Sequence, residues 1–349
     1  MNPVITQLPI LILYPHSRCN CRCVMCDIWK TSESREITAA DLERHAADIA
    51  SLGVRWVIFS GGEPLMHSDL FRLCATLRPL GVRLTILSTG LLLARHATRI
   101  VEHVDEVIVS LDGPLAVHNR IRRVVGAYEF MSEGIRELHR LRPDFPIAGR
   151  CTIQKQNCTS LIATVDTARE LGLSSTSFLA ADLTSTAFNR PEVWTLERQA
   201  EVGLTADDIG VLEQEIEALI ESGACGACGA FILESPDKLR RIVRHFRAHL
   251  GLAEAVAPRC NAPWVSAVLE SDGTVRPCFF HEPIGNVSGQ SLIDVLNGPR
   301  AVEFRESLRI AENPICRRCV CSLYSPQQTQ TEPRPSGSGL PTASKEIEI

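Results

Sequence analysis

The stretch Pro15-His-Ser-Arg-Cys19-Asn-Cys21-Arg-Cys23-Val-Met-Cys26-Asp-Ile-Trp-Lys30 contains the strongest signal in this chain. Three of its four cysteines, Cys19, Cys23 and Cys26, have the spacing C-x3-C-x2-C. Thiolates are soft ligands that favour iron–sulfur clusters or zinc. Three thiolates bind three irons of a [4Fe–4S] cube and leave the fourth iron open to a substrate. The alternative is a closed zinc loop in which Cys21 is the fourth ligand.

Apolar, β-branched runs begin just before this stretch and recur along the first half of the chain. We expect strands at Ile10–Tyr14, Trp56–Ser60, Leu84–Ser88, Glu106–Leu111, Ile147–Ile153 and Thr176–Leu183. Amphipathic stretches at Ala39–Leu52, Leu70–Leu80 and Gly134–Leu141 predict helices between them. This alternation predicts right-handed crossovers and a parallel sheet. The fold class is therefore α/β, a partial (β/α)6 TIM-like barrel whose loops after the strands share one face.

The pattern changes near residue 205. Helices are expected at Ala206–Glu221 and Asp237–Leu250. Ser271-Asp272-Gly273 then predicts a hairpin that joins Ser266–Glu270 to Thr274–Pro277. We divide the chain into a core at 5–204, a helical linker region at 205–254, a small α+β domain at 255–324 and a tail at 325–349. The tail has no aromatic residue and is rich in Pro, Gln, Thr, Ser and Gly, so we expect it to be disordered.

The composition of the 349 residues excludes several classes of protein. A formal net charge of −5 gives no reason to expect binding to nucleic acid or to an anionic membrane. No apolar run approaches the roughly 18 residues of a membrane span. The segment MNPVITQLPILILYP lacks a basic leader and a cleavage site, so we expect a cytoplasmic protein. Its 14 cysteines then indicate metal or redox chemistry rather than disulfides.

Short motifs end the second, third and fourth expected strands. They read Ser60-Gly61-Gly62-Glu63-Pro64, Ser88-Thr89-Gly90 and Ser110-Leu111-Asp112-Gly113-Pro114, and the last is followed by His118-Asn119-x-Ile121-Arg122. In a barrel the carboxyl ends of the strands share a face, which places these motifs beside the cysteine loop. A Gly-Gly turn alone is common. A Gly-Gly-Glu-Pro turn after strand two, combined with C-x3-C-x2-C after strand one, is hard to obtain by chance.

Together these motifs resemble the radical S-adenosylmethionine superfamily. The resemblance implies a [4Fe–4S] cluster on Cys19, Cys23 and Cys26, whose open iron chelates the methionine moiety of S-adenosylmethionine. It implies reductive cleavage to a 5′-deoxyadenosyl radical, with the Gly-Gly-Glu-Pro motif receiving the methionine ammonium. The cofactor-binding residues that it implies are Gly61, Gly62, Glu63, Pro64, Met25, Ser88, Ser110, Asp112 and Arg122.

Met25 departs from the usual pattern of the superfamily, and Arg122 has a second possible interpretation. Many members of the superfamily have an aromatic residue where this chain has Met25, whose apolar, polarisable side chain can fill the same space. Arg122 would contact a carboxylate or, like its neighbour Arg123, lie on a solvated helix face.

The C-terminal cysteines form a second group, Cys260-x12-Gly273-x4-Cys278 followed by Cys316-x2-Cys319-x-Cys321. This pattern resembles the auxiliary-cluster domains called SPASM and twitch, and the small number of cysteines favours the shorter twitch type. The resemblance implies one further [4Fe–4S] cluster, two in all. Its ligands would be Cys260, Cys278, Cys316 and Cys319, with Cys321 as a substitute for Cys319. A structural zinc site is the alternative.

Weaker signals suggest catalytic residues. Cys225-Gly-Ala-Cys228 would supply a thiol hydrogen donor or a redox pair, or is simply a linker of small residues. Asp182, with Thr184 beside it, would face the substrate at the mouth of a barrel. Cys151 and Cys158 have no ligand spacing, and we expect them to be small buried thiols.

The resemblance implies an enzyme that abstracts a hydrogen atom from a small-molecule or peptide substrate. The auxiliary cluster would transfer electrons or position the substrate. A flavodoxin-type or ferredoxin-type electron donor is the expected partner, and the basic helix at Leu239–Arg247 is either its docking face or a solvated surface. A ribosomal-peptide maturase is one alternative. A zinc-binding structural or regulatory protein without catalysis is another, although it leaves the Gly-Gly-Glu-Pro motif unexplained.

Overall fold

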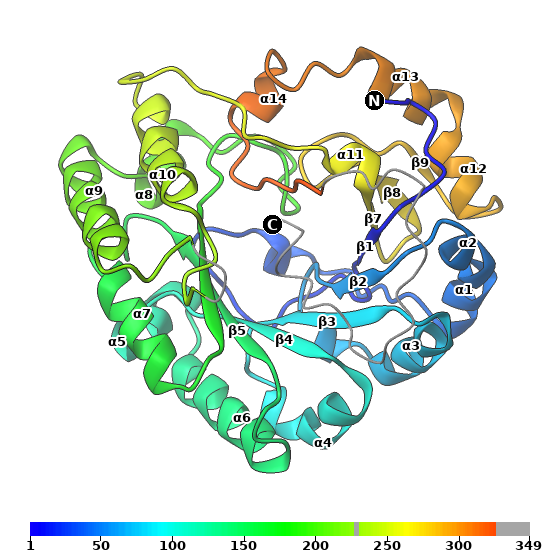
Figure 1. The fold of residues 1–349 in the computed structure, drawn as a ribbon, viewed down its shortest axis with the longest axis horizontal. Coiled ribbons are helices and arrows are strands. Elements are labelled where there is room, and N and C mark those ends of the chain that lie inside the picture. Colours follow the sequence, from blue (N-terminus) through cyan, green and yellow to red (C-terminus); the bar gives the residue numbers. More distant parts are fainter. Residues whose placement is uncertain (227–229, 326–349) are drawn as a thin grey trace.

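The computed structural model describes residues 1–226 and 230–325. Within these residues one sheet of nine strands runs in the order β6-β5-β4-β3-β2-β1-β7-β8-β9 (Figure 1). Its first six strands are all parallel: β1 (Ile10–Leu13), β2 (Trp56–Phe59), β3 (Arg83–Ser88), β4 (Glu106–Ser110), β5 (Ile147–Ile153) and β6 (Ser175–Ala180). The predicted partial (β/α)6 barrel is confirmed. β6, the last of these six strands along the chain, ends at Ala180, so Asp182 and Thr184 lie in the loop that follows it.

Helices cover the outer face of this curved sheet, as Figure 1 shows for α3, α4 and α6. They are α1 (Ala39–Arg44), α2 (Ala46–Ser51), α3 (Leu70–Leu77), α4 (Leu93–His103), α5 (Leu115–Arg122), α6 (Ala127–Leu141) and α7 (Leu161–Glu170). Single 3-10 turns lie at Ile28–Lys30, Pro64–Met66 and Arg78–Leu80. The helix expected at Ala39–Leu52 is interrupted at His45, whose backbone leaves the helical region with φ −104° and ψ 2°.

The two faces of the sheet differ in burial. Every residue of β1 and β2 is buried, which is why these strands read as unbroken apolar runs. In β4 burial alternates, and the barrel-facing Glu106, Ile108 and Ser110 are only partly buried. Half-buried side chains on the inner face leave room inside the barrel, below the loops that carry the motifs.

The C-terminal hairpin continues the core sheet. β7 (Ser266–Leu269) and β8 (Thr274–Arg276) are antiparallel, as predicted, and β9 (Gly285–Asn286) extends them. The unexpected feature is that β7 pairs in parallel with β1, with Ile10 opposite Ser266. The hairpin and the barrel are therefore parts of one hydrogen-bonded sheet.

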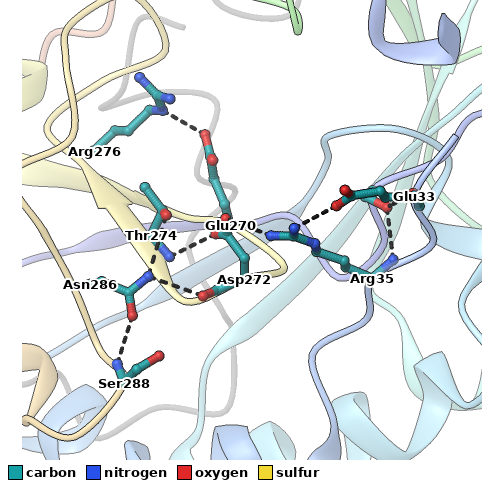
Figure 2. A network of polar contacts seen from close by, with 9 residues as sticks. Glu33, Arg35, Glu270, Asp272, Thr274, Arg276, Asn286 and Ser288 are labelled. Carbon is teal, nitrogen blue, oxygen red and sulfur yellow. Dashed lines mark hydrogen bonds and ion pairs between the residues drawn. The ribbon is translucent and has the colours of Figure 1, made fainter. Parts of the chain in front are cut away.

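Side chains also fix the turn of this hairpin. Figure 2 shows Arg276 paired with Glu270 at 2.6 Å, across the strands. Arg35, in the segment that follows the cysteine loop, lies 3.4 Å from Asp272 in the turn and 2.5 Å from Glu33. These contacts tie the turn to the part of the chain that carries the first cysteine group.

The other edge of the barrel, at β6, is covered by a short segment. The Thr176 amide donates to the Phe231 carbonyl at 2.8 Å, and the Leu233 amide donates to Thr176 at 3.0 Å. Beside this segment lie α8 (Leu196–Val202), α9 (Ala206–Glu221) and α10 (Pro236–His249). The helix predicted at Ala206–Glu221 has these bounds in the structure, and Thr205 and Asp208 form a capping box at its N-terminus.

The remaining helices are α11 (Ala262–Val265), α12 (Leu292–Asn297), α13 (Pro299–Ser307) and α14 (Pro314–Arg317). In the part of the chain that the structure describes, no helix has the length and apolar character needed to cross a membrane. Ser325, where the tail was expected to begin, is buried, and its backbone amide donates to the Asn261 side-chain oxygen at 3.0 Å. The rest of the expected tail, 326–349, lies outside the described residues.

Candidate cluster and cofactor site

The loop with Cys19, Cys23 and Cys26 follows β1 directly, at the carboxyl end of the barrel. Its backbone is held by the end of α5, since the Arg22 and Val24 amides both donate to α5 carbonyls at 3.1 Å. Cys23 is buried, whereas Cys19 and Cys26 are partly exposed. The donor set consists of thiolates from a single loop, which fits an iron–sulfur cluster.

Within residues 1–226 and 230–325, no three Cys, His, Asp or Glu side chains lie close enough together to hold one metal ion. A [4Fe–4S] cube binds each thiolate on a separate iron, so the three cysteines of this loop need not converge on one point.

Cys21 is buried beside Cys23 in this loop. The residue is 1% exposed, and its thiol donates a hydrogen bond to the sulfur of Cys23. This hydrogen bond lowers the pKa of Cys23 to about 7, and the Arg122 guanidinium contributes in the same direction. Cys21 therefore supports the charged form of a candidate ligand.

The two glycines of the Gly-Gly-Glu-Pro motif bring the end of β2 against the cysteine loop. A Cβ atom on Gly62 would lie 2.0 Å from the carbonyl oxygen of Arg18, and one on Gly61 would lie 2.6 Å from the ring of Tyr14. Gly61 also has a φ of +90°, which L side chains rarely adopt. The Glu63 amide then donates to the Arg18 carbonyl at 2.9 Å. Here the glycines allow one loop to approach another.

The Glu63 carboxylate is fully buried and hydrogen-bonded within the protein. It accepts from the Leu65 amide at 3.0 Å, from the Ser88 hydroxyl at 3.0 Å, and from the Thr89 amide and hydroxyl at 2.7 Å. Burial raises the pKa of Glu63, and these hydrogen bonds oppose that effect. The Thr89 hydroxyl also donates to Asn20 in the cysteine loop at 2.9 Å. Glu63 thus joins the ends of β2 and β3 beneath the loop.

Arg122 is a buried member of the site. Its Nη2 atom lies 2.7 Å from the Asp112 carboxylate, and its Nη1 atom donates to the Cys23 sulfur at 3.4 Å. Asp112 also accepts from the Thr152 amide on β5 at 3.1 Å. The alternative of a solvated helix face is wrong for Arg122, which is 6% exposed, whereas Arg123 is exposed. The ion pair connects β4, α5 and the cysteine loop.

A second arginine, which the sequence reading missed, covers the loop from the β6 side. Arg190 is buried and donates to the Asp182 carboxylate at 2.5 Å and to the Met25 carbonyl at 3.3 Å. Ser185 also donates to Asp182, at 2.6 Å. The Asp182 carboxylate is therefore held by two donors at the edge of the site. Met25 is buried beneath Arg190.

Trp194 extends this cover. Its ring lies 3.7 Å from the Arg190 guanidinium, and its indole N–H donates to Asp27 at 2.8 Å. Asp27, next to Cys26 in sequence, also pairs with Lys30 at 2.9 Å. A tryptophan following an arginine in a polar loop gives no motif, so only the three-dimensional contacts reveal this group.

The C-terminal cysteines gather at the same end of the barrel. Cys260, Cys278 and Cys319 lie close enough for their thiolate charges to interact. Burial raises the pKa of Cys278 to about 12. The Cys316 sulfur lies 3.3 Å from Nε2 of His281. Cys321 is near Cys319 but also faces the cations of the barrel interior. The fold thus assembles this group from both ends of a 60-residue segment.

Other candidate residues lie apart from the cysteine groups or have no functional contact. Cys225 is partly buried, and its thiol is 3.9 Å from the Leu219 carbonyl of α9. Cys228 lies outside the described residues. Cys151 and Cys158 are buried thiols, as predicted. Pro64 begins the short helical turn after Glu63, and Ser110 lies at the end of β4 opposite Arg150.

Two family models match the chain. The model of the radical SAM superfamily matches residues 13–156, and that of an iron–sulfur cluster-binding domain, SPASM, matches residues 260–320. The chain therefore carries a radical SAM domain and a SPASM domain. These two domains imply [4Fe–4S] clusters and S-adenosylmethionine as cofactors, and the similar proteins are named as enzymes. A zinc protein without catalysis is thereby set aside.

Similar proteins agree with the family. An AdoMet-dependent heme synthase of Methanosarcina barkeri is 33% identical over 176 residues, which make up 48% of this chain and 49% of that protein. A pre-heme d1 synthase of Dinoroseobacter shibae is 34% identical over 160 residues, which make up 45% of this chain and 39% of that protein. The matched stretches span less than half of each relative. The structure of Streptococcus suis SuiB bound to precursor peptide SuiA matches 91% of this chain and 72% of the SuiB chain. The TM-score is 0.65 at 16% sequence identity, so this likeness shows a shared fold.

Proposed function

We propose that Cys19, Cys23 and Cys26 bind the [4Fe–4S] cluster that this radical SAM enzyme uses to cleave S-adenosylmethionine. The observation that carries the proposal is the packing of the cysteine loop on the Gly-Gly-Glu-Pro turn, through Gly62 and the buried Glu63. When bound and reduced, the cluster supplies the electron that splits the sulfonium into methionine and a 5′-deoxyadenosyl radical, which takes a hydrogen atom from the substrate.

The protein positions this chemistry with its own residues. Glu63 holds the turn after β2 in place, so that the backbone of Gly61 and Gly62 borders the place of the methionine moiety. Arg122 sets a positive charge beside Cys23, which favours the thiolate. Arg190 and Trp194 cover Met25 and limit the access of water from the β6 side. Ser88, Ser110 and Asp112 complete the proposed cofactor site.

We further propose that Cys260, Cys278, Cys316 and Cys319 bind one auxiliary cluster in a domain spanning 255–324. Cys319 completes a C-x2-C pair with Cys316, and all four of these cysteines line the same cavity. Cys321 instead faces Arg150, Lys238 and Arg241. In this position the auxiliary cluster borders the barrel interior, where it would accept an electron or position the substrate.

A small-molecule substrate is the first candidate, because relatives over the core are named for heme and pre-heme d1. A peptide is the second candidate, since SuiB was solved with a precursor peptide. A flavodoxin-type or ferredoxin-type protein in the cytoplasm would supply the electron.

The test compares two groups of cysteines in anaerobically reconstituted protein. Changing Cys19, Cys23 and Cys26 together to Ala should abolish the formation of 5′-deoxyadenosine and remove about four of about eight irons. Cys74→Ala is the matched control, because this buried thiol lies on the outer helix α3. Equal loss of iron in the control, or full 5′-deoxyadenosine formation by the triple variant, would contradict the assignment.

A further inference from the structure

A large cleft opens between the barrel and the C-terminal segment. Its volume is about 1190 Å³, and we call it the outer cleft. It is bounded by the loop after β6, at 182–185, by α8 and α10, and by residues 314–319 around α14. Figure 1 shows α10 and α14 at the same end of the molecule.

Five cationic side chains line the outer cleft: Lys155, Arg241, Arg244, Arg317 and Arg318. The one carboxylate in its lining is that of Asp182, which is held by Arg190. Across the chain outside 227–229 and 326–349, none of these five cations forms an ion pair with an Asp or Glu side chain. This surface is therefore positive, although the chain as a whole is negative.

Backbone carbonyls fix several of these cations in place. Arg244 donates to the Glu254 carbonyl at 3.2 Å, Arg317 to Ala255 at 2.9 Å and Arg241 to Cys319 at 3.2 Å. A guanidinium has five N–H donors, so one such bond orients the group and leaves donors for a ligand. Guanidinium groups bind carboxylates in pairs of parallel hydrogen bonds.

Apolar side chains surround the cations. Leu196 is 77% exposed, and Val193, Val256, Leu250 and Ile315 are between 40% and 48% exposed. All five line the outer cleft. Exposed apolar residues gathered in one concave region mark a binding surface rather than ordinary surface scatter. The ligand that fits has both a large apolar body and negative charges.

A histidine with a buried, unpartnered ring nitrogen also borders this space. His245 on α10 lines the outer cleft, and its Nε2 atom is buried without a hydrogen-bond partner among the described residues. Its other ring nitrogen interacts with the Ala181 carbonyl, which leaves Nε2 for an external partner. Buried polar groups are normally satisfied, so this atom indicates a place where a ligand group or an ordered water belongs.

The outer cleft leads toward the proposed reaction site. Arg241, Phe280, Ile315 and Cys319 line both the outer cleft and a second cavity of about 120 Å³. We call this second space the inner cavity. Side chains from inside the barrel line it, together with all five C-terminal cysteines: Ile12, Ile58, Leu87, Ile108, Arg150, Cys260, Cys278, Cys316, Cys319 and Cys321. A ligand in the outer cleft would thus extend one part into the barrel interior, beside the C-terminal cysteines.

We propose that the outer cleft binds the substrate, and that this substrate is a small organic molecule with a large apolar body and at least two carboxylates. The inference rests on the proposed function, since it names the class of substrate for that reaction. Arg244 and Arg318 would hold carboxylates at the rim, with Arg241 deeper. The apolar residues at the rim would cover the body of the molecule.

The test measures binding, which needs no catalysis. The probe is coproporphyrin III, a fluorescent tetrapyrrole with four carboxylates, added to the reconstituted enzyme without S-adenosylmethionine. Wild type should bind it saturably, and the affinity should fall as salt increases. Arg244→Gln combined with Arg318→Gln should weaken binding at least about tenfold, since each removes a charged hydrogen-bond donor.

Matched controls lie on the same helix. Arg240 and Arg247 of α10 pair with Glu217 and Glu213 of α9, outside the cleft, so Arg240→Gln combined with Arg247→Gln should bind as wild type does. Iron content and circular dichroism check that each variant folds. Equal weakening by both pairs, equal binding of the tetramethyl ester, or no saturable binding would overturn the proposal. So would binding of an acidic Glu-rich peptide in place of coproporphyrin. Normal probe binding without 5′-deoxyadenosine formation would count against the proposed reaction alone.

Discussion

The Nη1 atom of Arg122 lies 3.4 Å from the sulfur of Cys23. Its Nη2 atom lies 2.7 Å from Asp112, and both charged side chains are buried. One guanidinium therefore links a candidate cluster ligand to the end of β4 and, through Asp112, to the Thr152 amide of β5. A cation in this position favours the thiolate form of Cys23. The Arg122–Asp112 ion pair therefore supports the candidate cluster ligand as well as the packing of the barrel.

Breaking the Arg122–Asp112 pair should destabilise the protein strongly. Arg122→Gln leaves a buried carboxylate without its counter-ion, which costs about 3–5 kcal/mol. Adding Asp112→Asn removes the unpaired charge, so the double variant should be more stable than the sum of the single changes predicts. The measurement is a double-mutant cycle on anaerobic urea unfolding. Additive effects would show that the two residues do not interact.

Gly62→Ala should disturb the cysteine loop, because a Cβ atom there would lie 2.0 Å from the Arg18 carbonyl. We expect a loss of iron on reconstitution and a lower unfolding temperature. The control is Gly210→Ala on α9, where a Cβ atom meets nothing within 4 Å. Alanine should stabilise that helix by up to about 1 kcal/mol. Normal iron content in Gly62→Ala would mean that the loop does not depend on this close approach.

Cys21→Ser distinguishes an open three-cysteine site from a closed four-cysteine site. A serine hydroxyl can still donate to the Cys23 sulfur, so the variant should keep an iron content near that of wild type and should still form 5′-deoxyadenosine. Iron analysis and a product assay measure both. Loss of metal as complete as in Cys23→Ser would identify Cys21 as a ligand and leave no open iron.

Buried His118 should make stability depend on pH. Burial lowers its pKa from 6.5 to about 3 in the folded protein. Between these values the unfolded chain binds a proton that the folded chain excludes, so the free energy of unfolding falls as pH is lowered, by up to about 1.4 kcal/mol per unit. His118→Asn should therefore show a shallower decline than wild type in unfolding measured from pH 7 to pH 5.5. Parallel slopes for both proteins would contradict this role.

Local signals explain what could be predicted from the sequence. The barrel strands are short apolar runs, and the cysteine groups are recognisable from spacing alone. β5 matches its predicted bounds because Ile147–Ile153 is bracketed by loops and packed between β4 and β6. The Gly-Gly-Glu-Pro motif likewise keeps its place at the end of β2.

Features made by distant residues could not be predicted. Arg122 sits in a charged helical stretch that reads as solvated, and only its contact with Asp112 shows that it is buried. Arg190 and Trp194 cover the cysteine loop although they lie more than 160 residues away from it in sequence. No recognisable sequence motif contains them. The pairing of β7 with β1 also required the three-dimensional structure, since a hairpin signal does not specify which sheet its edge joins.

The most direct test of the central claim is the anaerobic incubation of the reduced, reconstituted wild-type protein with S-adenosylmethionine. We expect about eight irons and eight sulfides per chain and the formation of 5′-deoxyadenosine and methionine. Iron and sulfide analysis with chromatography of the products measures both quantities on one sample. Stoichiometric zinc without iron, together with unchanged S-adenosylmethionine, would contradict the account.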